Sequence, residues 1–298
     1  AHQRGLDAES FIARVEESGA APLAAVPQTL ELLFRLETGG TFPRTRAELF
    51  SKGCQKLCEE PDTSRWEQTR AGHRTTQAGA EHAQRRLQLA SQIAAATLFC
   101  GRTGLWLGPP SECPEGYLCP NLDLPLSELA CNMDELRDLS RAPIFRVEQG
   151  DSIHWTHRSF CEYLAAQFAV GLPKERAIEL LVHPDSPHVV PQLAGVAAWM
   201  ASRDPSMFQL LLQRDPHFLL AADLGLAEPK DRHDLVQALL NGLEEGRFSR
   251  DAPQSQFYFK LDHPGLAEQL RGTIANRSLS ALTRSEAIRM AWKCQVSS

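Results

Sequence analysis

A single histidine, His157, lies where a predicted β-hairpin runs into a predicted helix. The hairpin arms, residues 145–147 and 153–155, alternate apolar and polar side chains, and residues 149–152 have the chemistry of a turn. His157 lies two residues after Trp155 and four after Ile153, so in an extended strand it points to the same side as these apolar residues. From Phe160 onward apolar residues recur every four positions, as on one face of a helix. Because the N–H groups and macrodipole of a helix N-terminus attract anions, a histidine there could bind a phosphate.

Two other interpretations of this junction stay open. A histidine on an apolar face is commonly a core residue that is hydrogen-bonded to a backbone carbonyl. Cys161 lies four residues after His157, and a Cys–His pair could in principle be nucleophilic. The position of Cys161 on an apolar helix face predicts a buried, inert thiol instead.

The elements before the junction have the order of a winged-helix domain. Residues 1–60 are expected to form a small helical domain, in which Pro27 occupies the first turn of a helix, a position that favours proline. Residues 61–84 are polar and predict a connection or a solvated helix. Residues 85–171 then predict a helix, a strand at 105–107, short helices at 126–130 and 133–141, and the hairpin wing.

Residues 172–298 are expected to be helical throughout and to form a superhelical repeat domain. Candidate helices cover 174–182, 189–202, 206–213, 216–223, 230–243, 263–272 and 283–294. Consecutive helix pairs without a strict period indicate a degenerate HEAT-like or TPR-like α-solenoid. The last helix reaches the end of the sequence, so the array is expected to be truncated.

Composition excludes several classes of protein. The 298 residues are 43% hydrophobic and 23% charged, as in an ordinary globular protein, and the net charge of −6 disfavours a general nucleic-acid or acidic-membrane surface. No apolar run has the length of a membrane span, and no signal peptide is recognised. The eight cysteines lack metal-site spacing and suit the reducing cytoplasm, although Cys113 and Cys119 flank a loop and could pair. Because the sequence does not begin with methionine, a fragment of a longer chain is expected.

Catalytic motifs are missing from the sequence. It contains no G-x-x-x-x-G-K-[S/T] stretch to cradle phosphates, no paired acids after an apolar run to hold Mg²⁺, no H-E-x-x-H and no G-x-S-x-G. No catalytic residue or metal ligand is therefore predicted, and the chain by itself is not expected to be an enzyme.

Two segments resemble NACHT-type STAND nucleotide-switch ATPases. The first is the hairpin followed by T-H-R-S-F-x-E-Y-L-A-A at 156–166, which is similar to the end of the family's winged-helix domain. The second is P-x-T-L-E-L-L at 27–33 with x-P-x-T-R-x-E-L-F at 42–50, which is similar to the family's first helical domain. In that family the histidine matched by His157 contacts the β-phosphate of ADP, and the proline matched by Pro27 packs on the adenine ring.

The resemblance implies a nucleotide switch whose P-loop domain lies outside this sequence. ADP or ATP would be the cofactor, the parent protein would be an NTPase, and the ADP-bound state would be a closed monomer. A protein ligand on the C-terminal arm would open it and allow homo-oligomerisation. Bacterial members often act in antiphage defence, a form of innate immunity. The resemblance therefore implies that the ligand of the C-terminal arm could be a viral protein.

Two alternatives from other functional classes remain. A DNA-binding winged-helix regulator would use residues 133–141 as its recognition helix, but Asp134, Glu135 and Asp138 there would repel phosphates. A helical-repeat interaction scaffold without any nucleotide would explain the C-terminal half alone.

Overall fold

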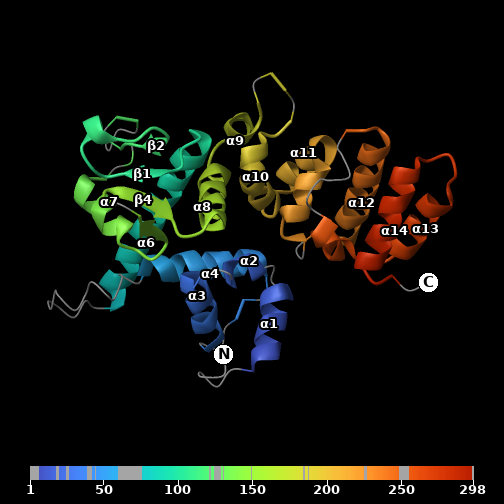
Figure 1. Cartoon of the computed structure of the whole chain (residues 1–298), viewed down its shortest axis with the longest axis horizontal. Coiled ribbons are helices and arrows are strands. Elements are labelled where there is room, and N and C mark those ends of the chain that lie inside the picture. Colours follow the sequence, from blue (N-terminus) through green and yellow to red (C-terminus); the bar gives the residue numbers. More distant parts are fainter. Residues whose placement is uncertain are drawn as a thin grey trace. The chain divides into compact units, whose positions relative to one another are not determined.

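The computed structural model describes residues 7–17, 20–24, 27–38, 42–43, 45–59, 76–120, 122–123, 129, 131–148, 150–183, 185–186, 188–224, 227–247 and 255–296. In these ranges the protein is mainly helical with one small mixed sheet (Figure 1). It divides into two compact units, Ala1–Leu172 and Pro173–Ser298. The residues assigned from the sequence to a helical domain and a winged-helix domain lie together in the first unit. The finer domain division stays a prediction.

Four helices begin the first unit: α1 (Ala8–Glu17), α2 (Ala21–Ala24), α3 (Pro27–Thr38) and α4 (Arg46–Glu59). The Phe11 ring of α1 stacks on Phe34 of α3, with ring centroids 4.8 Å apart. The Thr45 hydroxyl accepts a hydrogen bond from the Glu48 N–H at 3.1 Å and caps α4. Since α4 buries its apolar side chains along one face, it packs on the helices that follow.

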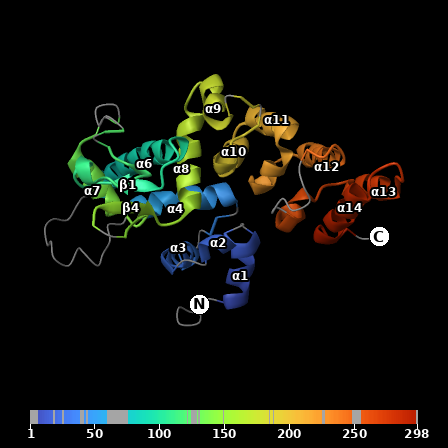
Figure 2. The same ribbon diagram turned by 45° about the horizontal axis from the view of Figure 1, so that its top comes forward.

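Helix α6 (Thr76–Phe99) and helix α8 (Arg158–Val170) pack side by side and form the core of the first unit (Figure 2). Helix α6 begins within the segment that the sequence suggested as a connection or solvated helix. Alanine, glutamine and glutamate in that stretch favour a helix. Ala83 is also buried, so this part of the helix is held by packing.

The sheet has the strand order β2-β1-β4-β3. Strand β1 (Gly104–Trp106) pairs in parallel with β2 (Tyr117–Leu118) and antiparallel with β4 (Ser152–Trp155). Strands β3 (Phe145–Val147) and β4 form the predicted hairpin, and Gly150 in its turn has φ +59°, which favours glycine. Strand β2 was not predicted, because it has two residues and follows a loop that contains the short 3₁₀ helix η2 (Pro110–Glu112).

Helix α7 (Met133–Ser140) confirms the short helix predicted at 133–141. The Asn132 side chain accepts from the N–H groups of Asp134 and Glu135, while the Glu135 carboxylate accepts from the Asn132 N–H, which completes a capping box. The helix predicted at 126–130 lies outside the described residues, apart from Leu129, which is a turn residue.

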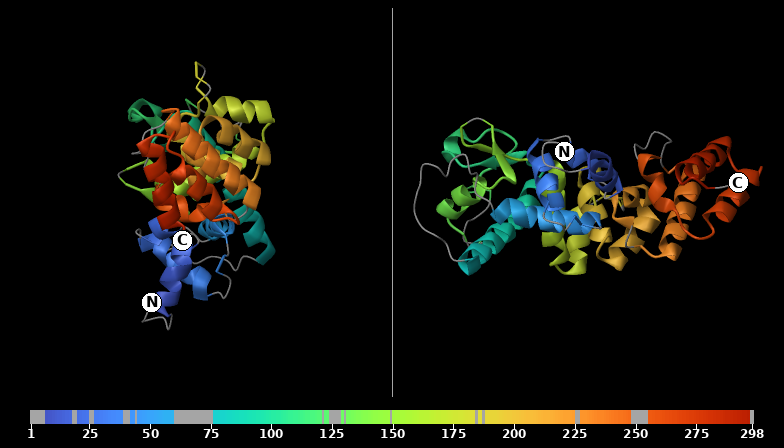
Figure 3. Two further views of the ribbon diagram at one scale, coloured as in Figure 1. Left: turned by 90° about the vertical axis from the view of Figure 1, so that its right-hand side faces the viewer. Right: turned by 90° about the horizontal axis from the view of Figure 1, so that it is seen from below.

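The second unit contains α9 (Lys174–Leu181), η3 (Pro191–Leu193), α10 (Ala194–Ala201), α11 (Pro205–Arg214) and η4 (Pro216–Ala221) in its first half. Its second half contains α12 (Pro229–Glu244), η6 (Ser255–Leu261), α13 (Leu266–Ala275) and α14 (Ala281–Lys293), and Figure 3 shows the orange-to-red helices of this half packed together. The helix predicted at 216–223 is a 3₁₀ helix, and η6 was not predicted. No described helix combines the length and the apolarity needed to cross a membrane.

Candidate functional site

Hydrogen bonds hold the hairpin in place up to the residue before His157. Strand pairing sets Phe145 opposite Trp155, and their rings lie 4.4 Å apart between centroids. The N–H of Thr156 then donates to the Ile144 carbonyl at 3.0 Å, and its hydroxyl donates to the Pro143 carbonyl at 2.8 Å. His157 is therefore presented by a backbone that is fixed on its N-terminal side.

His157 is the N-cap residue of α8, with φ −146° and ψ 133°. Its Nδ1 accepts a hydrogen bond from the Ser159 N–H at 3.2 Å, and the Ser159 hydroxyl also contacts Nδ1. Because Nδ1 acts as the acceptor of the amide, the neutral imidazole carries its proton on Nε2. The predicted histidine at the strand–helix junction is thus confirmed, and its ring is a hydrogen-bond donor through Nε2.

This geometry makes His157 the cap of α8, while its interpretation as a core residue bound to a carbonyl stays a prediction. The side chain is half-buried, and its ring contacts Phe160 edge-on at 6.4 Å between centroids. The cap accepts from a backbone amide, which is one of the N–H groups that a helix leaves without an intrahelical partner. The imidazole consequently has a structural role whether or not it also binds a phosphate.

Helix α3 begins at Pro27, as predicted from the tolerance of a helix start for proline. The Pro27 side chain lies outside the described residues, so its packing on a purine ring stays a prediction. Helices α3 and α8 both pack near Gly53 of α4. A Cβ added at Gly53 would lie 3.3 Å from the Leu32 side chain of α3 and 3.6 Å from the Phe160 ring of α8. The two elements that carry the predicted site residues therefore pack against the same face of α4.

Two residues near the junction were not singled out from the sequence. Ser159 orients the His157 ring, and Arg46 of α4 places its guanidinium 5.4 Å from the centroid of the Phe50 ring. The Phe50 ring in turn lies 5.3 Å from Phe160, so Arg46 is connected to the first turn of α8 through aromatic contacts. The sequence signals available for them were a serine two residues after the histidine and the T-R pair at 45–46, where α4 begins.

Cys161 is buried, and its thiol lies 3.8 Å from the Ala94 carbonyl oxygen. Burial, with a smaller contribution from Glu162, raises the pKa of this thiol well above its ordinary value. A thiol that stays protonated is a poor nucleophile. The predicted burial of Cys161 is confirmed. That it is not a catalytic partner of His157 stays a prediction.

The remaining cysteines and acidic residues do not assemble a metal site in the described part of the chain, where no cluster of three or more candidate ligands occurs. All eight cysteines are free thiols, including Cys113 and Cys119.

No protein-family model matches this chain, and no curated protein matches it significantly.

Proposed function

We propose that this chain is the regulatory part of a nucleotide-switch ATPase similar to the NACHT-type STAND proteins. ADP, held by a P-loop domain that these residues do not contain, is contacted by His157 in the closed state. The observation that supports this role is the cap geometry: Nδ1 accepts from the Ser159 N–H, which leaves the ring proton on Nε2. A donor at a helix N-terminus is suited to a phosphate, because the backbone there also carries partial positive charge.

The arrangement of the first unit supports a winged-helix assignment for residues 85–171. Strand β1 pairs with β4 of the hairpin, α7 precedes the hairpin, and α6 packs on α8. In this proposal the hairpin is the wing and α8 is the helix that follows it. The second unit, with its successive short helices, serves as a HEAT-like or TPR-like arm that receives a protein ligand.

The switch follows from the energetics of one contact. A hydrogen bond to a charged group contributes about 1.5–3 kcal/mol, so a bond made only in the closed state favours that state by roughly ten- to a hundredfold. A ligand on the arm that binds the open state better shifts the balance in the opposite direction. Opening then allows nucleotide exchange and homo-oligomerisation.

The test compares His157→Ala with His157→Asn in the longer protein that includes a P-loop domain. Asparagine is a good N-cap residue, so His157→Asn retains the cap of α8 but lacks the imidazole Nε2–H. Both variants should lose ADP affinity by about ten- to a hundredfold and oligomerise without a ligand, while only His157→Ala should lower the melting temperature without nucleotide. Unchanged ADP affinity in His157→Asn would refute the sensor role and favour a scaffold without a nucleotide.

The charges of α7 disfavour the DNA-binding alternative. Arg86 of α6 donates two hydrogen bonds to Asp138 of α7, and Arg85 pairs with Glu135 at 3.2 Å. Arg85 and Arg86 of α6 are thus neutralised by α7, and the exposed Arg137 of α7 lies 3.7 Å from the Asp134 carboxylate, which reduces its attraction for a DNA phosphate. A shift of labelled duplex DNA at low salt would contradict this conclusion.

A further inference from the structure

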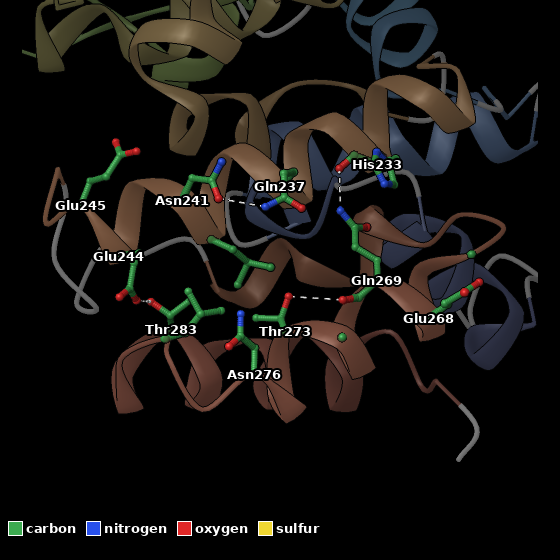
Figure 4. A pocket seen from close by; sticks show the side chains of 14 residues that line it. His233, Gln237, Asn241, Glu244, Glu245, Glu268, Gln269, Thr273, Asn276 and Thr283 are labelled. Atoms are coloured by element: carbon green, nitrogen blue, oxygen red, sulfur yellow. Dashed lines mark hydrogen bonds between the residues drawn. The ribbon is translucent and has the colours of Figure 1, made fainter.

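A groove of about 660 Å³ runs between α12 and α13 in the second unit (Figure 4). We call it the α12–α13 groove. His233, Gln237 and Asn241 recur every four residues along the lining face of α12. Gln269 and Thr273 of α13 and its C-cap residue Asn276 line the other side at nearly the same spacing. Two helices therefore present facing rows of polar side chains.

Hydrogen bonds to neighbouring segments hold the two walls in position. The Glu244 carboxylate of α12 accepts from the Ser280 N–H at 3.0 Å and from the Thr283 hydroxyl at 2.7 Å. Near the other end, the Gln269 side-chain amide donates to the His233 carbonyl at 3.1 Å. A groove whose walls are already fixed loses less conformational entropy when a ligand enters.

The groove is open along α13. Gly272 lines it, and a Cβ added at Gly272 would meet no heavy atom within 4 Å. Leu240 and Leu279 add apolar contact area between the polar rows. An extended chain could therefore lie lengthwise in the groove with its backbone near the carboxamides.

The lining has the hydrogen-bonding capacity and the charge to recognise a basic peptide. The Gln237 carboxamide donates to the Asn241 Oδ1 at 2.8 Å, and because each carboxamide has two N–H donors and an oxygen with two lone pairs, the pair retains hydrogen-bonding capacity for a peptide backbone. Among the described lining residues, three are glutamates (Glu244, Glu245 and Glu268) and none is lysine or arginine. Hydrogen bonds from Thr283 and Ser280 lower the pKa of Glu244, which keeps that carboxylate ionised.

We infer that the α12–α13 groove binds an extended basic segment of a protein partner. From His233 to Glu244 the helix rises by about 17 Å, which matches roughly five extended residues. Carboxamides would pair with the peptide backbone, and the glutamates would bind lysine or arginine side chains. The regulatory meaning of this site rests on the proposed function, because a ligand on the arm is what opens the switch; the binding itself requires only the second unit.

The test uses the full chain, a fluorescein-labelled Lys-Ser repeat peptide of about six residues, and fluorescence anisotropy. Gly272→Arg places a long cationic side chain in the groove, and Gly272→Ala is the matched control that adds only a methyl group. Both substitutions should keep or raise the melting temperature, because glycine is unfavourable inside a helix. Glu268→Lys reverses one charge on the lining and changes no wall contact described above.

The inference predicts that the peptide binds wild type and Gly272→Ala equally, while Gly272→Arg and Glu268→Lys each weaken binding by about tenfold or more. A Glu-Ser peptide should not bind. Equal binding to Gly272→Arg, equal binding of the Glu-Ser peptide, or no binding of the Lys-Ser peptide would overturn the inference. So would a dimer that Gly272→Arg dissociates, because it would assign the groove to a second copy. The ADP affinity of His157→Asn reports on the switch separately, so failure of either proposal leaves the other testable.

Discussion

Asp138→Asn should destabilise the first unit more than Arg86→Met, although both remove the same ion pair. Arg86 donates from Nε and from a terminal nitrogen to the two Asp138 oxygens at 2.9 and 2.8 Å. It also donates to the carbonyl of Cys58 in the last turn of α4 at 3.2 Å. The exposed fraction is 8% for the Arg86 side chain and 37% for Asp138. The arginine is thus the partner that water cannot easily reach.

The magnitudes follow from which group is left behind. Removing one partner of a fully buried pair costs about 3–5 kcal/mol. Asp138 is partly solvated and asparagine can still accept one hydrogen bond, so we expect about 2–3 kcal/mol for Asp138→Asn. In Arg86→Met the carboxylate can hydrate and keeps His82 at 2.8 Å, so the main loss is the donor to the Cys58 carbonyl, about 1–2 kcal/mol. The double variant should cost less than the sum of the two.

Urea unfolding at several pH values tests this account. Burial acts to raise the pKa of Asp138, but hydrogen bonds and charge from Arg86 and His82 outweigh it and lower the pKa below its ordinary value. The ionised carboxylate therefore stabilises the folded state above about pH 4, and this stabilisation is lost as the pH falls through the folded-state pKa. The deficit of Asp138→Asn should shrink toward zero in acid. A larger cost for Arg86→Met, or a deficit independent of pH, would refute the reasoning.

Four further outcomes are expected. Without nucleotide, His157→Ala should lower the unfolding free energy by about 1 kcal/mol and His157→Asn by less than about 0.5 kcal/mol, measured by chemical denaturation. Gly104→Ala should cost about 1–3 kcal/mol in the same assay, because its Cβ would lie 2.6 Å from the Ile153 carbonyl oxygen. Native iodoacetamide labelling followed by mass spectrometry should modify the exposed Cys100 well before the buried Cys161. The purified chain should hydrolyse no ATP, and phosphate release that follows the protein peak would contradict this.

Local patterns in the sequence determined many of the elements. Alternating apolar and polar residues in two short arms predict the hairpin at 145–155, and an apolar residue at every fourth position predicts α8 after His157. Both signals can be recognised because they depend only on neighbours in the sequence. The same signals found α12 and placed Pro27 at the start of α3. They failed for the two-residue strand β2, whose pairing with β1 is non-local, and for η4, whose apolar residues suit an α-helix and a 3₁₀ helix equally well. They also left the start of α6 undecided, since its first turns have a weak apolar pattern.

Only the tertiary structure decided how these elements meet and which atoms bond. Periodicity assigns His157 to a face but cannot show that Nδ1 accepts from the Ser159 N–H, because the ring orientation decides which imidazole nitrogen meets that amide. Arg86 and Asp138 are 52 residues apart, and their bond exists only because α6 and α7 pack together. The α12–α13 groove also depends on tertiary packing. Helices α12 and α13 both pack on α14, and only then do polar residues with ordinary helical spacing line one groove beside Gly272.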